Sequence, residues 1–393
     1  MDNFFSKITE LFSPNREPAL PLPAGMYHFQ SPPDAPTQYR LHLRMEPDGK
    51  GLLIINARTT LHLNKTAAEF AYYLVHGAST KTILDQLSDR YNAKRELLQT
   101  DYQQFLDTIE SMAKTEDLDP QTFFAIDRAD PYSKDISAPY RLDCALTYRQ
   151  NEKNTVDVVP SDRVRRELLT TEWHQILQKA WNAGIPHIIF TGGEPTIRPD
   201  LVDLISYSEN LGQVTGILTD GYRLCDPDYL HELLNAGVDH LMILLDPKED
   251  QSWEAVLDTM KEDIFVTVHL TINSDQTEPH CETIDRLAGM GVKSLSLTEK
   301  TEVFSPTLKK CAEYAASKSM SLVWDIPVPY SIHNPINMEL TEETVINGAG
   351  KAWLYVEPDG DVLPAQGVNQ LLGNLLLNTW ESIWNNPQRN VLK

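Results

Sequence analysis

A pair of glycines followed by an acid, at the end of an apolar run, is the part of this sequence best suited to bind a small ligand. Residues 187–190 are strand-like, and residues 191–195 read Thr-Gly-Gly-Glu-Pro. Two adjacent glycines allow the backbone to turn sharply and to approach a ligand without a Cβ clash. Glu194 can then offer its carboxylate to an ammonium group. We therefore expect an ammonium-binding turn here, with an ordinary tight turn as the alternative.

Strands and helices alternate through residues 136–330, and these elements must position the turn. Strands separated by helices of about 10–15 residues form βαβ units around a parallel sheet. Six or more such units predict an α/β fold with a partial TIM-like (β/α)6 barrel, whose site lies at the carboxyl ends of the strands. The expected strands are 142–148, 185–190, 214–218, 240–245, 265–272, 294–297 and 321–324. The expected helices are 172–182, 201–211, 227–235, 253–261, 281–290 and 308–318.

This pattern, together with the Gly-Gly-Glu-Pro turn, resembles the radical-SAM superfamily. Members carry a CxxxCxxC motif in the loop after the first barrel strand and a glycine-rich turn after the second. The resemblance implies that the second turn contacts the ammonium group of S-adenosylmethionine (SAM), and that the third strand end lies near its methionyl carboxylate or ribose. The cofactor-binding residues implied in this way are Gly192, Gly193, Glu194, Pro195, Thr219, Asp220 and Gly221.

The cluster-binding cysteines of that family are missing from this chain. Gln150, Asn154 and Asp157 stand at the three positions. A [4Fe-4S] cluster needs soft thiolate ligands, which two neutral amides and one hard carboxylate do not replace. An alternative register using Cys144, Tyr148 and Asn151 supplies one thiolate out of three. We therefore predict that no [4Fe-4S] cluster binds, that reductive cleavage of SAM does not occur, and that the chain has no catalytic residue of this kind.

Two further groups of side chains offer other chemistry. Asp157 with Glu194 or Asp220 would supply oxygen ligands suited to Mg²⁺ or Mn²⁺, but solvated acids explain these residues more simply, and we expect no metal site. His269, inside the strand expected at 265–272, is a candidate to line the barrel mouth. A hydrogen-bonded core histidine is the commoner situation for such a residue.

The barrel is preceded by two segments, residues 1–40 and 41–115. The first contains a short amphipathic patch and a proline-rich stretch, which predict a docking helix and an extended linker. Two short strands and three helices in the second segment resemble a PqqD-like domain, a small α+β, winged-helix-like unit that recognises leader peptides; Leu-His-Leu-Asn at 61–64 and Gly-Ala-Ser-Thr at 77–80 carry the resemblance. A generic winged-helix-like domain is the alternative. Both predict that a peptide binds by strand addition to an exposed sheet edge.

The remaining residues, 331–393, are expected to form a β-hairpin extension. Pro-Asp-Gly at 358–360 is typical of a hairpin turn. The segment resembles the SPASM or twitch extension that follows the barrel in peptide-modifying radical-SAM enzymes. There, cysteines flank the hairpin and bind auxiliary clusters. In this chain Asn347 and Ala365 stand at the matching positions, so these cysteines are missing too.

Composition and charge restrict the partners that this chain can have. A net charge of −22 and a pI near 4.8 argue against nucleic acid and against an anionic membrane surface. No apolar run approaches the roughly 20 residues of a membrane span, and the N-terminus lacks the features of a secretory signal. Cys144, Cys225, Cys281 and Cys311 are widely separated, which predicts buried single thiols rather than disulfides. We therefore expect a cytoplasmic protein.

Together these features predict a degenerate radical-SAM-like protein, a pseudoenzyme that binds a leader-like peptide. It would act as a scaffold, or as the partner of an active maturase, in the modification of ribosomally made peptides. Binding of SAM at residues 192–194 is left open. One alternative is a SAM-dependent or other enzyme that works without a cluster and uses Glu194, Asp220 and His269. The other is a functional radical-SAM peptide maturase.

Overall fold

The computed structural model describes residues 20–390 with the exception of 33, 57–58, 92, 115–135, 152–163, 165 and 324–347. The chain divides into two compact units. The first contains the residues before 138 together with 182–186, and the second contains the rest. Each unit is described by itself. The amphipathic patch expected near the N-terminus lies outside the described residues.

An antiparallel sheet followed by three helices forms the first unit. The strands are β1 (Gly25–Gln30), β2 (Arg40–Met45), β3 (Gly51–Ile55) and β4 (Thr59–Leu63), and they lie in that order in the sheet. The helices are α2 (Lys65–Val75), α3 (Thr80–Tyr91) and α4 (Arg95–Lys114). Asn64 accepts a hydrogen bond of 2.9 Å from the backbone N of Ala67, and so caps α2 as its position predicts. The core of the unit includes the fully buried Leu41, Leu43, Phe70 and Phe105.

Strand β1 corrects the expectation that residues 1–40 form only a helix and a linker. It pairs with β2 over its whole length, from Gly25 opposite Met45 to Gln30 opposite Arg40. The prolines that predicted an extended linker lie on either side of this strand. Between them Tyr27 and Phe29, two residues apart and therefore on one face, pack against the core of the unit.

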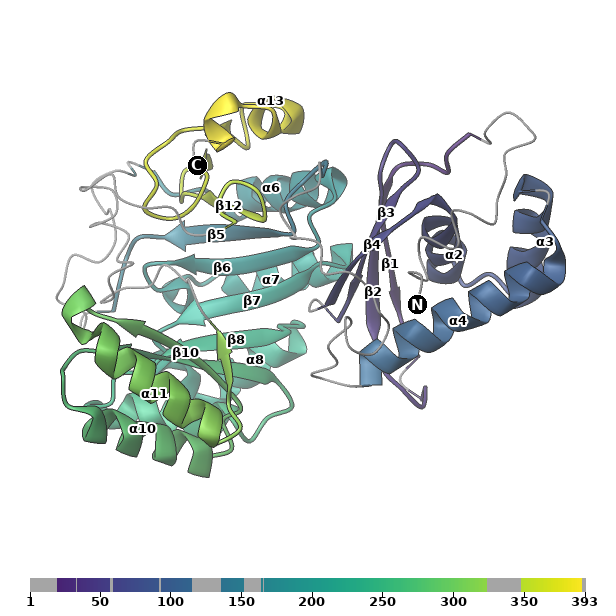
Figure 1. Ribbon diagram of the computed structural model, residues 1–393. Helices are drawn as coiled ribbons and strands as arrows, with labels where there is room; N and C mark the ends of the chain where they lie inside the picture. The colour runs from purple at the N-terminus through teal and green to yellow at the C-terminus, as the bar shows by residue number, and fades with distance from the viewer. Residues whose placement is uncertain are drawn as a thin grey trace. The chain divides into compact units, whose positions relative to one another are not determined.

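A ten-stranded sheet organises the second unit. Its order is β11-β10-β9-β8-β7-β6-β5-β12-β13-β14, and the strands from β5 to β11 are all parallel (Figure 1). The strands are β5 (Arg141–Thr147), β6 (His187–Gly192), β7 (Val214–Thr219), β8 (His240–Leu244), β9 (Phe265–Ile272), β10 (Ser294–Glu299) and β11 (Ser321–Val323). The helices are α6 (Thr170–Ala183), α7 (Leu201–Leu211), α8 (Pro227–Asn235), α9 (Asp250–Thr259), α10 (Thr277–Gly289) and α11 (Ser305–Ser317).

Six β/α units follow one another in this part of the chain, which confirms the expected partial barrel. Every second residue of a strand is completely shielded, as Ile188 and Phe190 on β6 and Leu241 and Ile243 on β8 show. Gly212 ends α7 with a φ of 92°, a left-handed conformation that glycine adopts without strain. Of the described helices, none is both long and apolar enough to cross a lipid bilayer.

The C-terminal segment joins the same sheet. Strand β12 (Trp353–Val356) pairs in parallel with β5, and β13 (Asp361–Leu363) and β14 (Gly373–Asn374) continue antiparallel from it. The hairpin between β12 and β13 has the expected turn, in which the N–H of Gly360 donates to the carbonyl of Glu357 at 2.8 Å. A short helix, α13 (Trp380–Trp384), follows. The hairpin segment is therefore continuous with the barrel sheet.

Candidate active site

The Gly-Gly-Glu-Pro turn at the end of β6 lies directly against the end of β5. The backbone N–H of Gly193 donates to the carbonyl of Thr147 at 2.7 Å, and that of Glu194 donates to the carbonyl of Arg149 at 2.8 Å. A Cβ atom on Gly192 would lie 2.2 Å from the Thr147 oxygen, and one on Gly193 would lie 2.1 Å from the Arg149 oxygen. The glycines are thus required by the close approach of two stretches of backbone within the chain.

Glu194 is buried, and its carboxylate links the ends of β6 and β7. Its Oε1 accepts hydrogen bonds from the backbone N and the hydroxyl of Thr196, at 2.9 and 2.6 Å, and from the hydroxyl of Thr219 at 2.8 Å. Its Oε2 accepts from the backbone N of Asp220 at 2.7 Å. The residue is 1% exposed. Pro195 begins the short 3-10 helix η1 (Pro195–Ile197), for which Glu194 is the cap.

Asp220 lies at the end of β7 and contacts the loop that follows β5. Its Oδ2 accepts a hydrogen bond of 2.6 Å from the side chain of Asn151, and its Oδ1 accepts one of 3.1 Å from the backbone N of Tyr222. Gly221, with a φ of 80°, makes the turn into η2 (Tyr222–Cys225). The structure therefore gathers the residues expected at the second and third strand ends into one polar cluster, and adds Asn151 to it.

The electrostatics of this cluster favour a positive charge. Burial, together with the nearby negative charge of Asp220, raises the pKa of Glu194 to about 8, although hydrogen bonds from Thr196 and Asp220 oppose the increase. Two neighbouring carboxylates in a buried site are stabilised by a shared proton or by another cation. An ammonium or sulfonium group bound here would take the place of the proton.

Of the three positions where cluster ligands were expected, the structure describes only the first, Gln150. At Gln150 the side-chain Oε1 is buried and has no hydrogen-bond partner among the described residues. Asn154 and Asp157 lie outside the described residues. Cys144 is completely buried within β5, and burial raises the pKa of its thiol well above the usual value. These donors do not fit a cluster held by three thiolates.

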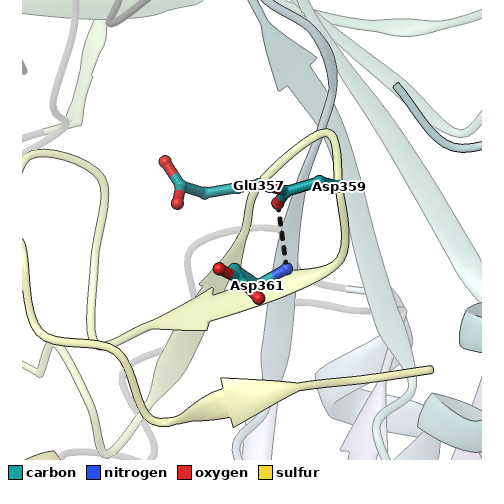
Figure 2. A group of neighbouring side chains, drawn as sticks. All are labelled: Glu357, Asp359 and Asp361. Atoms are coloured by element: carbon teal, nitrogen blue, oxygen red, sulfur yellow. Dashed lines mark hydrogen bonds between the residues drawn. The ribbon is translucent and has the colours of Figure 1, made fainter. Parts of the chain in front are cut away.

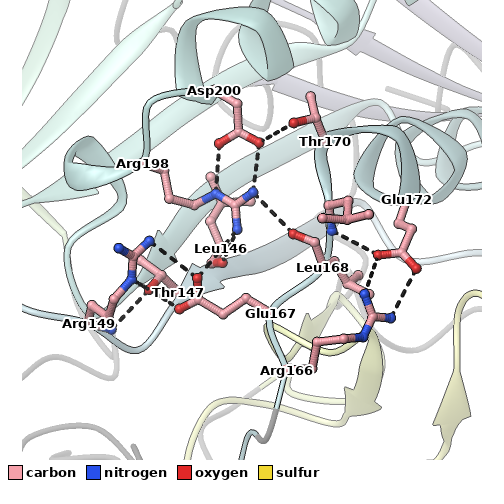
Figure 3. A network of polar contacts seen from close by, with 11 residues as sticks. Leu146, Thr147, Arg149, Arg166, Glu167, Leu168, Thr170, Glu172, Arg198 and Asp200 are labelled. Atoms are coloured by element: carbon pink, nitrogen blue, oxygen red, sulfur yellow. Dashed lines mark hydrogen bonds and ion pairs between the residues drawn. The ribbon is translucent and has the colours of Figure 1, made fainter.

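An ionic network that the sequence analysis missed holds the far end of the loop after β5. Figure 3 shows the buried Arg198 between the carboxylate of Asp200 and the carbonyls of Leu146 and Leu168. The guanidinium donates to these carbonyls at 2.9 and 3.2 Å and to both carboxylate oxygens of Asp200, at 2.8 and 2.7 Å. The hydroxyl of Thr147 also donates to Glu167. An arginine two residues before an aspartate at a helix start was the available signal.

His269 is enclosed within the sheet. It is 2% exposed, and its Nδ1 lies 2.9 Å from the hydroxyl of Ser296. Its Nε2 lies 3.2 Å from the hydroxyl of Thr271 and 3.3 Å from that of Thr298. Burial lowers its pKa to about 3. This geometry is that of a neutral, hydrogen-bonded core histidine.

An acidic group lies on the hairpin turn between β12 and β13. Figure 2 shows Glu357, Asp359 and Asp361, whose carboxylate oxygens lie within 4.8 Å of one another. Protein groups already bind them: the hydroxyl of Tyr148 donates to Glu357 at 3.1 Å, and the side-chain amide of Asn374 donates to Asp361 at 2.9 Å. We therefore assign no metal to this turn.

Of the two positions that the resemblance to a SPASM extension singled out, the structure describes one. Ala365 is completely buried and packs with Ala349 and Trp353. Asn347 lies outside the described residues. The Ala365 position is therefore filled by apolar packing.

The second unit is a partial barrel of parallel strands. A glycine-rich turn that contains Glu194 follows its second strand, β6. Residues 144–298 match the sequence profile of the radical SAM superfamily. This part of the chain is therefore similar to a radical SAM domain.

Relatives of known function are peptide-modifying enzymes. The chain is 25% identical over 241 residues to the PqqA peptide cyclase of Bradyrhizobium diazoefficiens, a match that covers 55% of this chain and 63% of the relative. It is 32% identical over 123 residues to the PqqA peptide cyclase of Streptomyces rochei, covering 31% of this chain and 34% of the relative. The matched region therefore spans less than two thirds of each relative.

Solved structures show the same fold. SuiB of Streptococcus suis bound to the precursor peptide SuiA superposes with a TM-score of 0.59 at 16% identity, over 88% of each chain. SuiB bound to S-adenosylmethionine gives a TM-score of 0.56 at 17% identity, over 88% of this chain and 86% of that one.

Proposed function

We propose that this protein binds a peptide together with SAM or a related adenosyl ligand, and that it works without a [4Fe-4S] cluster. In this proposal it is a scaffold, or the partner of an active maturase, in the modification of ribosomally made peptides. The observation that carries the proposal is an asymmetry within one site. The turn at residues 192–194 is hydrogen-bonded to the backbone of its acidic neighbour Asp220. At the first cluster position, by contrast, Gln150 supplies a neutral amide.

The acidic pair supports the adenosyl part of the proposal. SAM carries an ammonium group and a sulfonium group, and both are attracted to neighbouring carboxylates. Glu194 is 1% exposed and already accepts four hydrogen bonds, whereas Asp220 is 9% exposed. We therefore assign the direct contact with the ligand to Asp220 and the shaping of the turn to Glu194.

The first test joins two measurements on one sample of the full chain. Iron and sulfide are added under anaerobic conditions, the absorbance of the thiolate-to-iron band is recorded, and SAM is then titrated by calorimetry. We expect no retained iron and measurable SAM binding that Asp220→Asn weakens. Asp228→Asn, which removes an exposed charge from α8, is the matched control.

Each other outcome of that test changes the proposal in a defined way. Stoichiometric iron in a cluster that responds to SAM would refute the cluster-free proposal and indicate a functional radical-SAM maturase. Absence of both iron and SAM binding would refute the adenosyl part and leave the peptide-binding part to be tested alone.

Peptide binding is supported by features of the first unit. Strands β1 and β4 are the edges of its sheet, and a peptide can extend such an edge by backbone hydrogen bonds. Beside β1 the ring of Tyr27 lies 5.0 Å from that of Tyr72 and 5.1 Å from that of His76. Partly exposed tyrosines are common where proteins bind one another. Residues 20–114 also contain as many Lys and Arg as Asp and Glu, so the unit repels neither acidic nor basic peptides.

Strand addition predicts a measurable footprint. Peptides would be selected from a random display library on the full chain, and amide hydrogen exchange would then be compared with and without a selected peptide. We expect slower exchange in β1 or β4, and weaker binding to Tyr72→Ala than to the control Tyr207→Ala, which alters a tyrosine of α7. Failure to select any peptide, or protection confined to residues after 138, would exclude this mode of binding.

The acid pair also favours one alternative, an enzyme that uses SAM without a cluster. A carboxyl group with a pKa near 8 is poised to exchange protons at neutral pH. Conversion of SAM to S-adenosylhomocysteine or methylthioadenosine by the purified chain, abolished in Glu194→Gln, would establish this alternative. Unchanged SAM after long incubation would exclude it.

A further inference from the structure

Two of the four cysteines are brought together by the fold, and the proposed function uses neither of them. Cys281 lies on α10 and Cys311 on α11, the helices of two consecutive β/α units. The two thiols influence each other's pKa, and the helices that carry them pack against each other. The two residues are distant in the sequence because one complete β/α repeat separates them.

Contacts on either side of the thiols fix how the two helices face each other. Towards the helix starts, the hydroxyl of Thr307 donates to the carbonyl of Asp275 at 3.2 Å. About one turn beyond the thiols, Asp285 accepts a hydrogen bond of 2.8 Å from the hydroxyl of Tyr314 and pairs with Lys318 at 2.6 Å. Facing positions therefore advance together along both helices, and the two cysteines occupy the middle of this interface.

The two thiols differ in their access to solvent. Cys311 is completely buried, whereas Cys281 is partly exposed. A small oxidant can therefore reach Cys281 first, and Cys311 is the buried thiol on the neighbouring helix. Of the other two cysteines, Cys144 is buried inside β5, and the thiol of Cys225 donates to the carbonyl of Gln251 at 3.2 Å.

We propose that Cys281 and Cys311 form a redox-reactive dithiol that closes to a disulfide between α10 and α11. With hydrogen peroxide as the oxidant, the Cys281 thiolate attacks one peroxide oxygen, the O–O bond breaks, and hydroxide leaves. The resulting sulfenic acid is attacked by the deprotonated Cys311, the S–S bond forms, and a second hydroxide leaves; the two hydroxides take up the two protons that the thiols released. The two thiols lose two electrons, and one peroxide becomes two waters.

The surroundings of the pair set its rate and its pH dependence. Burial raises the pKa of both thiols, that of Cys311 to about 12. Because the thiolate is the nucleophile, closure is slow at neutral pH and accelerates as the pH rises. We therefore expect the two thiols to respond slowly, to sustained oxidation, and not to act as a rapid peroxide sensor.

The test uses the native full chain and intact mass. The protein is treated with hydrogen peroxide, the excess is removed with catalase, and the remaining thiols are alkylated after unfolding. We expect the wild type and the control Cys225→Ser to lose two alkylatable thiols and about 2 Da, and to recover both with dithiothreitol. Peptide mapping should place the bond between residues 281 and 311.

The single variants separate a disulfide from other oxidation. Cys281→Ser should keep its remaining thiols, and Cys311→Ser should instead gain oxygen at Cys281. The proposal is overturned if the wild type keeps all four thiols after prolonged treatment at alkaline pH, or if oxygen addition at Cys281 is the only product. The measurement on the wild type decides the question even if a variant fails to fold.

Discussion

Four hydrogen bonds converge on the carboxylate of Glu194, and they come from two different strand ends. Thr196 lies on its own turn, while Thr219 and Asp220 belong to β7. This residue therefore joins the ends of two neighbouring strands. The same burial that makes the link rigid also makes the negative charge costly, which the raised pKa of Glu194 expresses.

Glu194 should consequently contribute to the pH dependence of stability, beside the buried His240 and His269, whose lowered pKa values act in the opposite direction below about pH 6.5. The pKa of Glu194 is raised from 4.5 to about 8, so the folded state binds a proton that the unfolded state has lost between these values. The contribution of Glu194 to the free energy of unfolding then falls as the pH rises through this window, by at most about 1.4 kcal/mol per pH unit. Urea denaturation from pH 5 to pH 8 measures the slope, which Glu194→Gln should flatten. Equal slopes in both proteins would contradict the assignment.

The glycines of the turn give a second prediction at this scale. Gly193→Ala would place a Cβ atom 2.1 Å from the carbonyl oxygen of Arg149, which is backbone and cannot rotate away. We expect a loss of at least about 2 kcal/mol in the free energy of unfolding. Gly289→Ala is the control, because a Cβ there meets nothing within 4 Å and lies in a helix. Denaturant midpoints compare the two, and equal midpoints would show that the turn adjusts easily.

At the scale of elements, Arg198 connects three segments that are separate in the sequence. It binds the end of β5, the residues just before α6 and the start of α7, and only 7% of its side chain is exposed. A buried cation of this kind is stable because each donor has a partner. The network holds the end of β5 to the second β/α unit.

Removing the buried arginine should be far more costly than removing an exposed one nearby. Arg198→Met leaves Asp200 and two carbonyls without their donor, and we expect a loss of about 3–5 kcal/mol in the free energy of unfolding. Arg166→Met breaks an ion pair with Glu172 in which the arginine side chain is 61% exposed, and we expect little change. Thermal and urea denaturation of both variants provide the measurement. Similar losses would show that burial does not decide the effect.

Helices and strands were predictable where the local sequence contains the features that define them. The bounds expected for α7, α8 and β9 agree with the structure because apolar spacing and capping residues define each of them locally. Strand β1 was missed because it is stabilised by pairing with β2 and by contacts with the core, which the local sequence does not reveal. The prolines on both sides of it indicated an extended linker instead.

The site was predictable in its members but not in its contacts. Residues 192–195 and 219–221 come together because parallel strands end at one edge of the sheet. The roles within the cluster depend on long-range geometry, such as the hydrogen bond from Asn151 to Asp220. One sequence contains no local signal for such contacts.

For the whole molecule, acidic residues outnumber basic ones, and this excess is distributed unevenly along the chain. The chain has 56 Asp and Glu against 34 Lys and Arg, yet the two kinds are equal in number within residues 20–114. Most of the excess therefore belongs to the second unit. Like charges on one compact unit repel, and dissolved salt screens this repulsion.

Salt should accordingly stabilise the protein. Screening also weakens the exposed ion pairs, but these contribute little, so the net repulsion decides the sign. We expect the melting temperature at neutral pH to rise between low and physiological ionic strength, and the effect to vanish near the pI of about 4.8. Calorimetry at several sodium chloride concentrations checks this. A falling melting temperature would show that local ion pairs outweigh the net charge.

The parallel pairing of β12 with β5 has a consequence for how the chain is made. On one side, residues 141–144 of β5 pair with residues 353–356 of β12. The ribosome synthesises residues 353–356 only after all the strands and helices of the barrel. Until then one side of β5 is an open edge, which is a template for pairing with other chains. Such long-range contacts also slow folding. The nascent protein should therefore depend on protection of this edge by a chaperone, and chains cut before residue 353 should aggregate.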